Sequence, residues 1–192
     1  MKIFMIDNYD SFTYNLVHLL YALNHDVVVA RNDEVTVSQV ASADPDGIVI
    51  GPGPSRPERA GISVELIRAL GSKIPLLGVC LGHQAIGVAY GARIERVEPV
   101  HGKRSSISHS QTGLFAQSPA PLFAARYHSL AIERASLPEE LEITAWDKDQ
   151  TVMAIQHRTH PVVGLQFHPE SILTDDGQTL VGRFLDQYRG TT

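Results

Sequence analysis

The cysteine at position 80 stands in residues 78–82, GVCLG, between a short apolar run and a helical pattern. Glycines two residues to either side match the G-x-S-x-G nucleophile elbow, with a thiol in place of the hydroxyl. A side chain at either glycine would collide with the sharp turn that exposes the nucleophile. The helix dipole favours the thiolate, and the first amides of the helix can hold a developing oxyanion. We therefore predict a nucleophile at Cys80, although a cysteine without such neighbours is more often a small buried hydrophobe.

Residues 164–171, GLQFHPES, place a histidine at the end of an apolar run and a carboxylate two residues later. A cysteine nucleophile needs an imidazole to take its proton and return it to a leaving group, and a carboxylate on the far ring nitrogen fixes the tautomer. His168 and Glu170 suit these roles, and Pro169 stiffens their spacing. The other histidines lack such a carboxylate: His83 in a helix, His128 in a loop, and His157 and His160 in a polar turn expected to be exposed.

A metal site is a weaker interpretation of the same residues. Cys80 and His83, like His157 and His160, are three residues apart and could share a face. Structural zinc usually takes four Cys or His ligands in paired clusters, and the H-E-x-x-H pattern of metalloproteases is absent. We expect no metal and no other cofactor.

Two more segments follow expected strands and could contact a ligand. Residues 50–55, IGPGPS, form a rigid loop that a ligand can approach closely, but without the G-x-x-x-x-G-K-[ST] pattern of an ATP site. Residues 125–130, ARYHSL, offer hydroxyl and backbone hydrogen bonds. Ligands of open α/β sheets bind beyond the carboxyl ends of the strands, which makes both segments candidates, although Gly/Pro loops alone are mostly plain turns.

Apolar runs and helical patterns alternate through the first half of the chain. They predict strands at residues 2–6, 27–30, 47–50 and 76–79, and helices at residues 12–23, 62–70 and 81–90. Apolar runs without clean alternation are typical of parallel strands covered on both faces. The predicted fold class is therefore α/β, with a doubly wound, mostly parallel sheet and flanking helices.

The second half, from about Arg93, consists of shorter extended pieces separated by turns. We expect them to add antiparallel hairpins to the sheet, at residues 124–127, 143–146, 153–156 and 162–167. A last amphipathic helix is predicted over residues 178–188.

The composition suits one compact domain spanning residues 1–192. With 43% hydrophobic residues and no Pro/Gly/Ser-rich linker, the chain can build one core. The net charge is −5 and Lys and Arg are scattered along the chain, so the sequence shows no basic patch of the kind that binds nucleic acid or anionic lipid. One cysteine excludes an internal disulfide, and neither a signal peptide nor a membrane span is expected, so we predict a cytoplasmic protein.

Four ordered motifs resemble those of the class I, or triad, glutamine amidotransferases over essentially the whole chain. They are residues 51–54, 78–84, 127–130 and 166–171. Within that family, residues 7–15, 101–103 and 170–174 look like the glutaminase subunits of anthranilate synthase and 4-amino-4-deoxychorismate synthase. The resemblance implies a glutamine amidotransferase type-1 domain over residues 1–192.

On matching positions, the resemblance implies that Cys80 attacks the side-chain amide of glutamine and forms a glutamyl thioester. His168 would act as base and then acid, and Glu170 would orient it. The amides of Gly53 and Leu81 would form the oxyanion hole. Further contacts to glutamine would come from Pro54, Gln84, Ser129, Leu130 and Ser55, the last of which stands where many relatives carry a second glycine.

The implied partner is a large chorismate-binding synthase subunit, which would form a hetero-oligomer with this chain and receive ammonia through a protected passage. Asp10, Ser11 and residues 101–103 are candidates for the contact surface, although Asp10 and Ser11 could equally cap the first helix. We favour anthranilate synthase, with aminodeoxychorismate synthase, or service to both, as the alternative.

Two other classes of protein remain open. A stand-alone cysteine hydrolase of the same fold should act at full rate alone, on peptide or γ-glutamyl bonds. A non-catalytic module could keep the fold after losing the triad, but the presence of Cys80, His168 and Glu170 counts against it.

Overall fold

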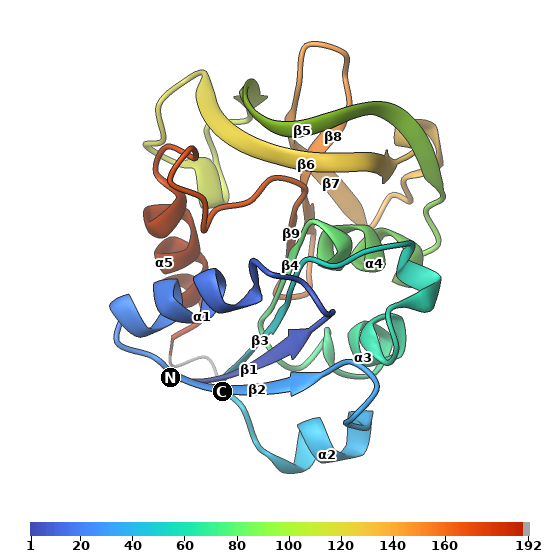
Figure 1. The fold of residues 1–192 in the computed structure, drawn as a ribbon, viewed down its shortest axis with the longest axis vertical. Helices are drawn as coiled ribbons and strands as arrows, with labels where there is room; N and C mark the ends of the chain where they lie inside the picture. The colour runs from blue at the N-terminus through green and yellow to red at the C-terminus, as the bar shows by residue number, and fades with distance from the viewer. Residues whose placement is uncertain (190–192) are drawn as a thin grey trace.

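The computed structural model describes residues 1–189, in which nine strands form one sheet (Figure 1). Five strands run parallel to one another: β1 (Lys2–Asp7), β2 (Asp26–Arg31), β3 (Gly47–Ile50), β4 (Leu76–Val79) and β9 (Val162–Leu165). Antiparallel pairing adds β5 (Ile94–His109), β6 (Leu122–Ile132), β7 (Leu141–Trp146) and β8 (Val152–His157). The order is β2-β1-β3-β4-β9-β8-β7-β5-β6, so the predicted fold class is confirmed.

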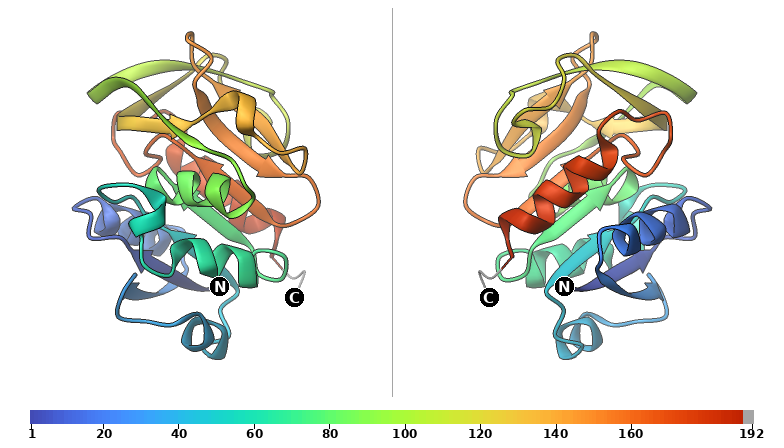
Figure 2. Two further views of the ribbon diagram at one scale, coloured as in Figure 1. Left: turned by 90° about the vertical axis from the view of Figure 1, so that its right-hand side faces the viewer. Right: turned by 90° about the vertical axis from the view of Figure 1, so that its left-hand side faces the viewer.

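Helices cover both faces of the parallel half (Figure 2). On one face lie α1 (Thr13–Ala22) and α5 (Gly177–Gln187), and on the other lie α3 (Ser63–Leu70) and α4 (Leu81–Ala89). Short helices occur as α2 (Val37–Ser42) and as the 3-10 turns η1 (Pro57–Arg59), η2 (Gly113–Phe115) and η3 (Arg134–Ser136).

Each face of the sheet has its own apolar core. In β1, Ile3 and Met5 point into the cluster under α1 and α5, whereas Phe4 and Ile6 point into the cluster under α3 and α4. Successive strand residues face opposite sides, which explains the continuous apolar runs of the parallel strands. Full burial of each large apolar side chain contributes about 1.5–3 kcal/mol, so these two clusters hold the helices on the sheet.

Three features of the fold differ from the sequence-based expectations. Helix α2 was not predicted, although Thr36 and Gln39 form a capping box at its start. Strand β5 is 16 residues long and pairs with β6 along most of its length, where only short pieces were expected. Strand β9 was expected only as part of an added hairpin. It does pair antiparallel with β8, but it also pairs in parallel with β4 at the centre of the sheet.

The parallel strands β1, β3, β4 and β9 end at one edge of the sheet. The segments after these ends are the turn at Asn8, the Gly51–Pro54 loop, the Cys80 turn and the stretch from Gln166 to Glu170. This edge is where doubly wound sheets bind their ligands. The fold therefore brings together four segments that lie up to about 160 residues apart in the sequence.

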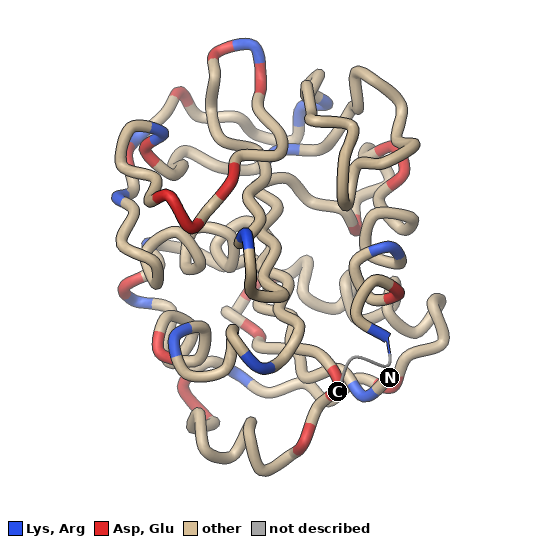
Figure 3. The backbone as a smooth tube through the Cα atoms, turned by 180° about the vertical axis from the view of Figure 1, so that it is seen from behind, with Lys and Arg blue, Asp and Glu red and all other residues tan. Residues whose placement is uncertain are grey.

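Positions of Lys and Arg and positions of Asp and Glu are both spread along the backbone (Figure 3). None of the helices within residues 1–189 combines the length and apolar character that crossing a membrane requires.

Two glycines allow α4 to pack directly on the sheet. A Cβ added at Gly82 would lie 2.2 Å from the Ile50 carbonyl oxygen, and one added at Gly78 would lie 2.5 Å from the Gly82 carbonyl group. Both distances are far below van der Waals contact with rigid backbone atoms. The turn between β4 and α4 therefore depends on the absence of side chains at these positions.

Gly82→Ala should lower the free energy of unfolding by about 3 kcal/mol, because the added methyl group overlaps the β3 backbone. Gly182→Ala is the matched control: its nearest neighbour would be a Leu23 methyl at 3.5 Å. In the interior of α5 this alanine should raise the free energy of unfolding by about 0.5–1 kcal/mol. Urea unfolding of both variants measures these changes in the free energy of unfolding. Equal changes at the two sites would contradict the proposed close packing.

Candidate active site

Cys80 occupies a strained turn at the start of α4. Its backbone has φ 54° and ψ −101°, a conformation that non-glycine residues rarely adopt. The turn is held by a hydrogen bond from the Cys80 amide to the Leu165 carbonyl (2.8 Å). Leu81 is the first residue of α4, where backbone amides have no partner within the helix. Such strain is typical of functional sites, and here it falls on a residue that lines a cavity.

His168 and Glu170 form a buried pair beyond the end of β9. The Nδ1 of His168 lies 2.6 Å from Oε1 of Glu170, and the two side chains are only 2% and 0% exposed. The His168 ring packs against the rings of Phe12 and Tyr127, both with centroids at 5.3 Å, and these two rings also contact each other. When the carboxylate accepts a hydrogen bond from Nδ1–H, Nε2 is the nitrogen available for proton exchange.

Burial by itself lowers the pKa of His168, but the Cys80 thiol and the Glu170 carboxylate outweigh burial and raise this pKa to about 10. The Nε2 atom makes no hydrogen bond with the described residues, although the neighbouring thiol contributes to the shift. A protonated ring at neutral pH stabilises a thiolate beside it. The arrangement can therefore hold a sulfur nucleophile and a proton donor together.

Gln166 contacts the Cys80 sulfur from the strand end and was given no role by the sequence analysis. Its Nε2 donates to the Cys80 sulfur at 3.7 Å, and its Oε1 accepts from Gln84 Nε2 at 3.1 Å. The side chain is completely buried. The sequence signal that could have revealed this role is a polar amide at the end of an otherwise apolar strand. Such an amide is buried with the strand and therefore needs hydrogen-bond partners.

A cavity of about 180 Å³ opens beside the thiol. This is smaller than the roughly 300–1,000 Å³ of sites for drug-sized ligands, and it suits a molecule of amino-acid size. Its lining contains all seven positions expected to contact substrate, together with Cys80, Tyr127 and His128: Gly53, Pro54, Ser55, Cys80, Leu81, Gln84, Tyr127, His128, Ser129 and Leu130. His168 and Glu170 are not among the lining residues.

The Gly51–Pro54 loop approaches the site by a close backbone contact. A Cβ at Gly53 would lie 2.5 Å from Cβ of Asn8 and 2.8 Å from a Leu81 methyl. Ser55 has φ 70°, the left-handed conformation that favours glycine. This explains why glycine is a natural alternative at that position.

Three of the histidines weighed as rival bases have surroundings that the sequence did not indicate. His83 is completely buried, and burial lowers its pKa to about 3. His128 lies within β6 rather than in a loop, because pairing with β5 continues to Ile132. His157 is buried rather than exposed and stacks on His160, with ring centroids 3.9 Å apart.

Asp10 lies in a turn just before α1, whose N-cap residue, Phe12, has no side-chain capping bond. Asp10 Oδ1 accepts from the Phe12 amide at 2.8 Å, so its side chain stabilises the entry to the helix. Within residues 1–189, no group of three or more His, Cys, Asp or Glu side chains is placed to hold a metal ion.

The chain belongs to the class-I glutamine amidotransferase family. The sequence model described as "Glutamine amidotransferase class-I" matches residues 4–188, which is nearly the whole chain. The residues brought together at the strand ends all lie in this matched region.

Curated relatives share about half of the sequence. Anthranilate synthase component 2 of Pseudomonas aeruginosa is 50% identical, with 97% of this chain and 96% of that protein covered. Aminodeoxychorismate synthase component 2 of Escherichia coli is 47% identical, with 95% and 98% covered. The bifunctional protein TrpGD of Thermotoga maritima is 50% identical over 96% of this chain, which spans only 32% of that longer protein.

Among solved structures, a Thermoplasma acidophilum protein described as a candidate GMP synthase component has a TM-score of 0.89. It covers 100% of this chain and 95% of its own, at 24% sequence identity. The likeness establishes the same fold.

Glu170→Gln should lower the pKa of His168, because the change removes the carboxylate charge that helps to raise it. Titration of histidine-labelled protein by 1H–15N NMR measures this pKa. The exposed Glu139→Gln is the matched control and should leave the pKa unchanged. An unchanged pKa in Glu170→Gln would contradict the buried pair.

The same pair has a predicted effect on stability. Because the pKa of His168 is raised above 6.5 in the folded protein, its stabilising effect is complete below about pH 6.5 and is lost as the pH rises through about 10. The stability advantage of the wild type over Glu170→Gln should therefore shrink across this interval, as measured by urea unfolding.

Proposed function

We propose that this chain is the glutaminase subunit of anthranilate synthase and acts through a Cys80–His168–Glu170 triad. The observation that carries the proposal is the strained turn that holds the Cys80 thiol near the buried His168–Glu170 pair, at the wall of a cavity of amino-acid size. The family supplies the reaction class, and the relatives' names supply the pathway. One glutamine amidotransferase domain would span residues 1–192, in a cytoplasmic protein.

In the proposed mechanism the Cys80 thiolate attacks the side-chain amide carbon of glutamine. The oxyanion that forms is stabilised by the amides of Gly53 and Leu81. The His168 imidazolium gives its proton to the amide nitrogen, the C–N bond breaks, and ammonia leaves behind a glutamyl thioester. His168 then takes a proton from water, and the hydroxide attacks the thioester carbon. The C–S bond breaks, which releases glutamate and restores the Cys80 thiolate beside protonated His168.

Substrate specificity is assigned to the walls of the cavity. Gln84 and the backbone of Ser129 and Leu130 would bind the amino-acid end of glutamine, and Pro54 and Ser55 would close the opposite side. Gln84 Nε2 already donates to the Leu130 carbonyl at 2.9 Å, so this hydrogen bond links α4 to β6 within the proposed binding site. This arrangement favours a small substrate with both charges at one end.

Released ammonia is useful only if a second active site consumes it, so we propose that the partner is a large chorismate-binding subunit. Two relatives at 50% and 47% identity are named as second components of synthases, which supports a two-component assembly. Two exposed apolar side chains, Tyr14 in α1 and Ile172 two residues after Glu170, suit a partner surface, together with Asp10, Ser11 and residues 101–103.

Aminodeoxychorismate synthase remains the second candidate, because a Bacillus subtilis relative at 46% identity carries both names. The two are distinguished by co-purifying the chain with its large partner and identifying the aromatic product. We expect 2-aminobenzoate. If 4-amino-4-deoxychorismate were the only product, the chain would be assigned to the second pathway. Full activity of the isolated chain on peptide or γ-glutamyl bonds would instead indicate a stand-alone hydrolase.

Cys80→Ser in the assembled complex should lower glutamine-dependent synthesis by at least about 10³-fold, because the nucleophile is lost. Synthesis with added ammonium salt should continue at the wild-type rate, which serves as the internal control for folding and assembly. Loss of both activities together would contradict the proposed division of labour.

A chloroketone analogue of glutamine should alkylate Cys80 in the wild-type complex. Peptide mapping by mass spectrometry locates the adduct. Labelling at another residue, or none in the presence of the partner, would overturn the assignment of the nucleophile.

A further inference from the structure

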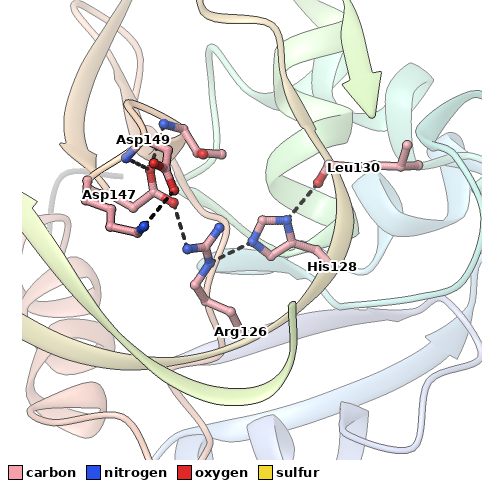
Figure 4. A network of polar contacts seen from close by, with 7 residues as sticks. Arg126, His128, Leu130, Asp147 and Asp149 are labelled. Carbon is pink, nitrogen blue, oxygen red and sulfur yellow. Dashed lines mark hydrogen bonds and ion pairs between the residues drawn. The ribbon is translucent and has the colours of Figure 1, made fainter. Parts of the chain in front are cut away.

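A buried chain of polar contacts runs from the turn after β7 to the cavity, through residues that the proposed mechanism does not use (Figure 4). Arg126 Nη1 donates to Asp147 Oδ2 at 2.7 Å, and Arg126 Nε donates to His128 Nε2 at 3.0 Å. His128 Nδ1 lies 3.0 Å from the Leu130 carbonyl oxygen. The side chains of Arg126 and Asp147 are 8% and 4% exposed, so this is a shielded ion pair.

Arg126 determines the tautomer of His128. A guanidinium carries only donors, so the His128 Nε2 that faces it must be an acceptor and the ring proton must lie on Nδ1. Burial first, and then the charge of Arg126, lower the pKa of His128 to about 4, so the ring is neutral at physiological pH. The Nδ1–H is then a permanent donor to the Leu130 carbonyl.

Asp147 is itself fixed by its turn. Its Oδ1 accepts from the amides of Asp149 (3.0 Å) and Thr151 (2.8 Å), while Oδ2 receives Arg126. Every oxygen of the buried carboxylate therefore has a partner, which removes the cost of an unpaired buried charge. A fully satisfied network of this kind makes His128 rigid.

The Leu130 carbonyl is the point where this network meets the cavity. It accepts from His128 Nδ1 and also from Gln84 Nε2 at 2.9 Å. Along β6, Leu130 pairs with Arg96, and the register of β5 shifts directly after Arg96 before pairing resumes between Val100 and His128. The side-chain donors therefore reinforce the Leu130 carbonyl at the border of an irregular stretch of the strand pair.

We propose that His128, held by Arg126 and Asp147, is a positioning residue that orients the Leu130 carbonyl and Gln84 for binding the amino-acid end of the substrate. The inference rests on the proposed function, because it concerns the same glutamine site. His128 does not touch the reacting atoms, so its loss should weaken substrate binding more than it slows the chemical step.

His128→Leu and His128→Asn form the decisive pair in the assembled complex. Leucine removes the donor, whereas the amide of asparagine can replace Nδ1–H toward the Leu130 carbonyl. We expect His128→Leu to raise KM for glutamine about tenfold with kcat within about threefold, as for loss of one oriented hydrogen bond. His128→Asn should restore most of the affinity, and ammonium-dependent synthesis should be normal in both variants.

Covalent labelling of Cys80 separates binding from reactivity. In His128→Leu, the glutamine-like chloroketone should react about tenfold more slowly at low concentration, because it needs the binding site. Iodoacetamide, which has no amino-acid end, should react at the wild-type rate. Where His128→Leu does not fold, Arg126→Lys serves instead, since lysine keeps the charge but cannot contact His128 and Asp147 with a fixed fork.

Equal slowing with both reagents, an unchanged KM, or failure of His128→Asn to recover affinity would each overturn the positioning role. Absence of chloroketone labelling at Cys80 in the wild type would instead count against the proposed function, so the two failures are distinguishable.

Discussion

The interaction of His168 with Glu170 and Cys80 is the physical feature on which the rest of the site depends. Burial lowers the pKa of His168, but the Cys80 thiol and the Glu170 carboxylate, which lies 2.6 Å from Nδ1, raise this pKa to about 10. A buried ion pair is stable only when its partners are held in good geometry. The bridge between Ala125 and His168 and the bond from Thr174 Oγ1 to the His168 carbonyl supply that rigidity from the backbone.

The turn at Cys80 is the second constraint, and it is steric rather than electrostatic. The strained backbone at Cys80 is tolerated because β4, α4 and β3 pack around it with no room for a side chain at Gly78 or Gly82. A strained backbone conformation persists only when the packing around it leaves no relaxed alternative. The two apolar clusters on the faces of the sheet provide the free energy that holds the turn.

The histidines illustrate how surroundings decide function for a single residue type. Burial lowers the pKa of His83, and burial with Arg126 lowers that of His128, so both rings are neutral. For His168 burial acts in the same direction, yet the adjacent carboxylate and thiol reverse the outcome. One ring is therefore suited to proton transfer and another to fixed hydrogen bonding, within the same site.

The sequence by itself determined the α/β class, the central parallel strands, the nucleophile elbow and the spacing of His168 and Glu170, because these depend on local periodicity, glycine sterics and short motifs. It missed α2 and the length of β5, and it placed His128 in a loop. Only the tertiary structure decided that Gln166 contacts Cys80 and that Arg126, Asp147 and His128 form one network. Such contacts join residues from different strands, and their geometry follows from register and twist, which no local pattern of residues encodes.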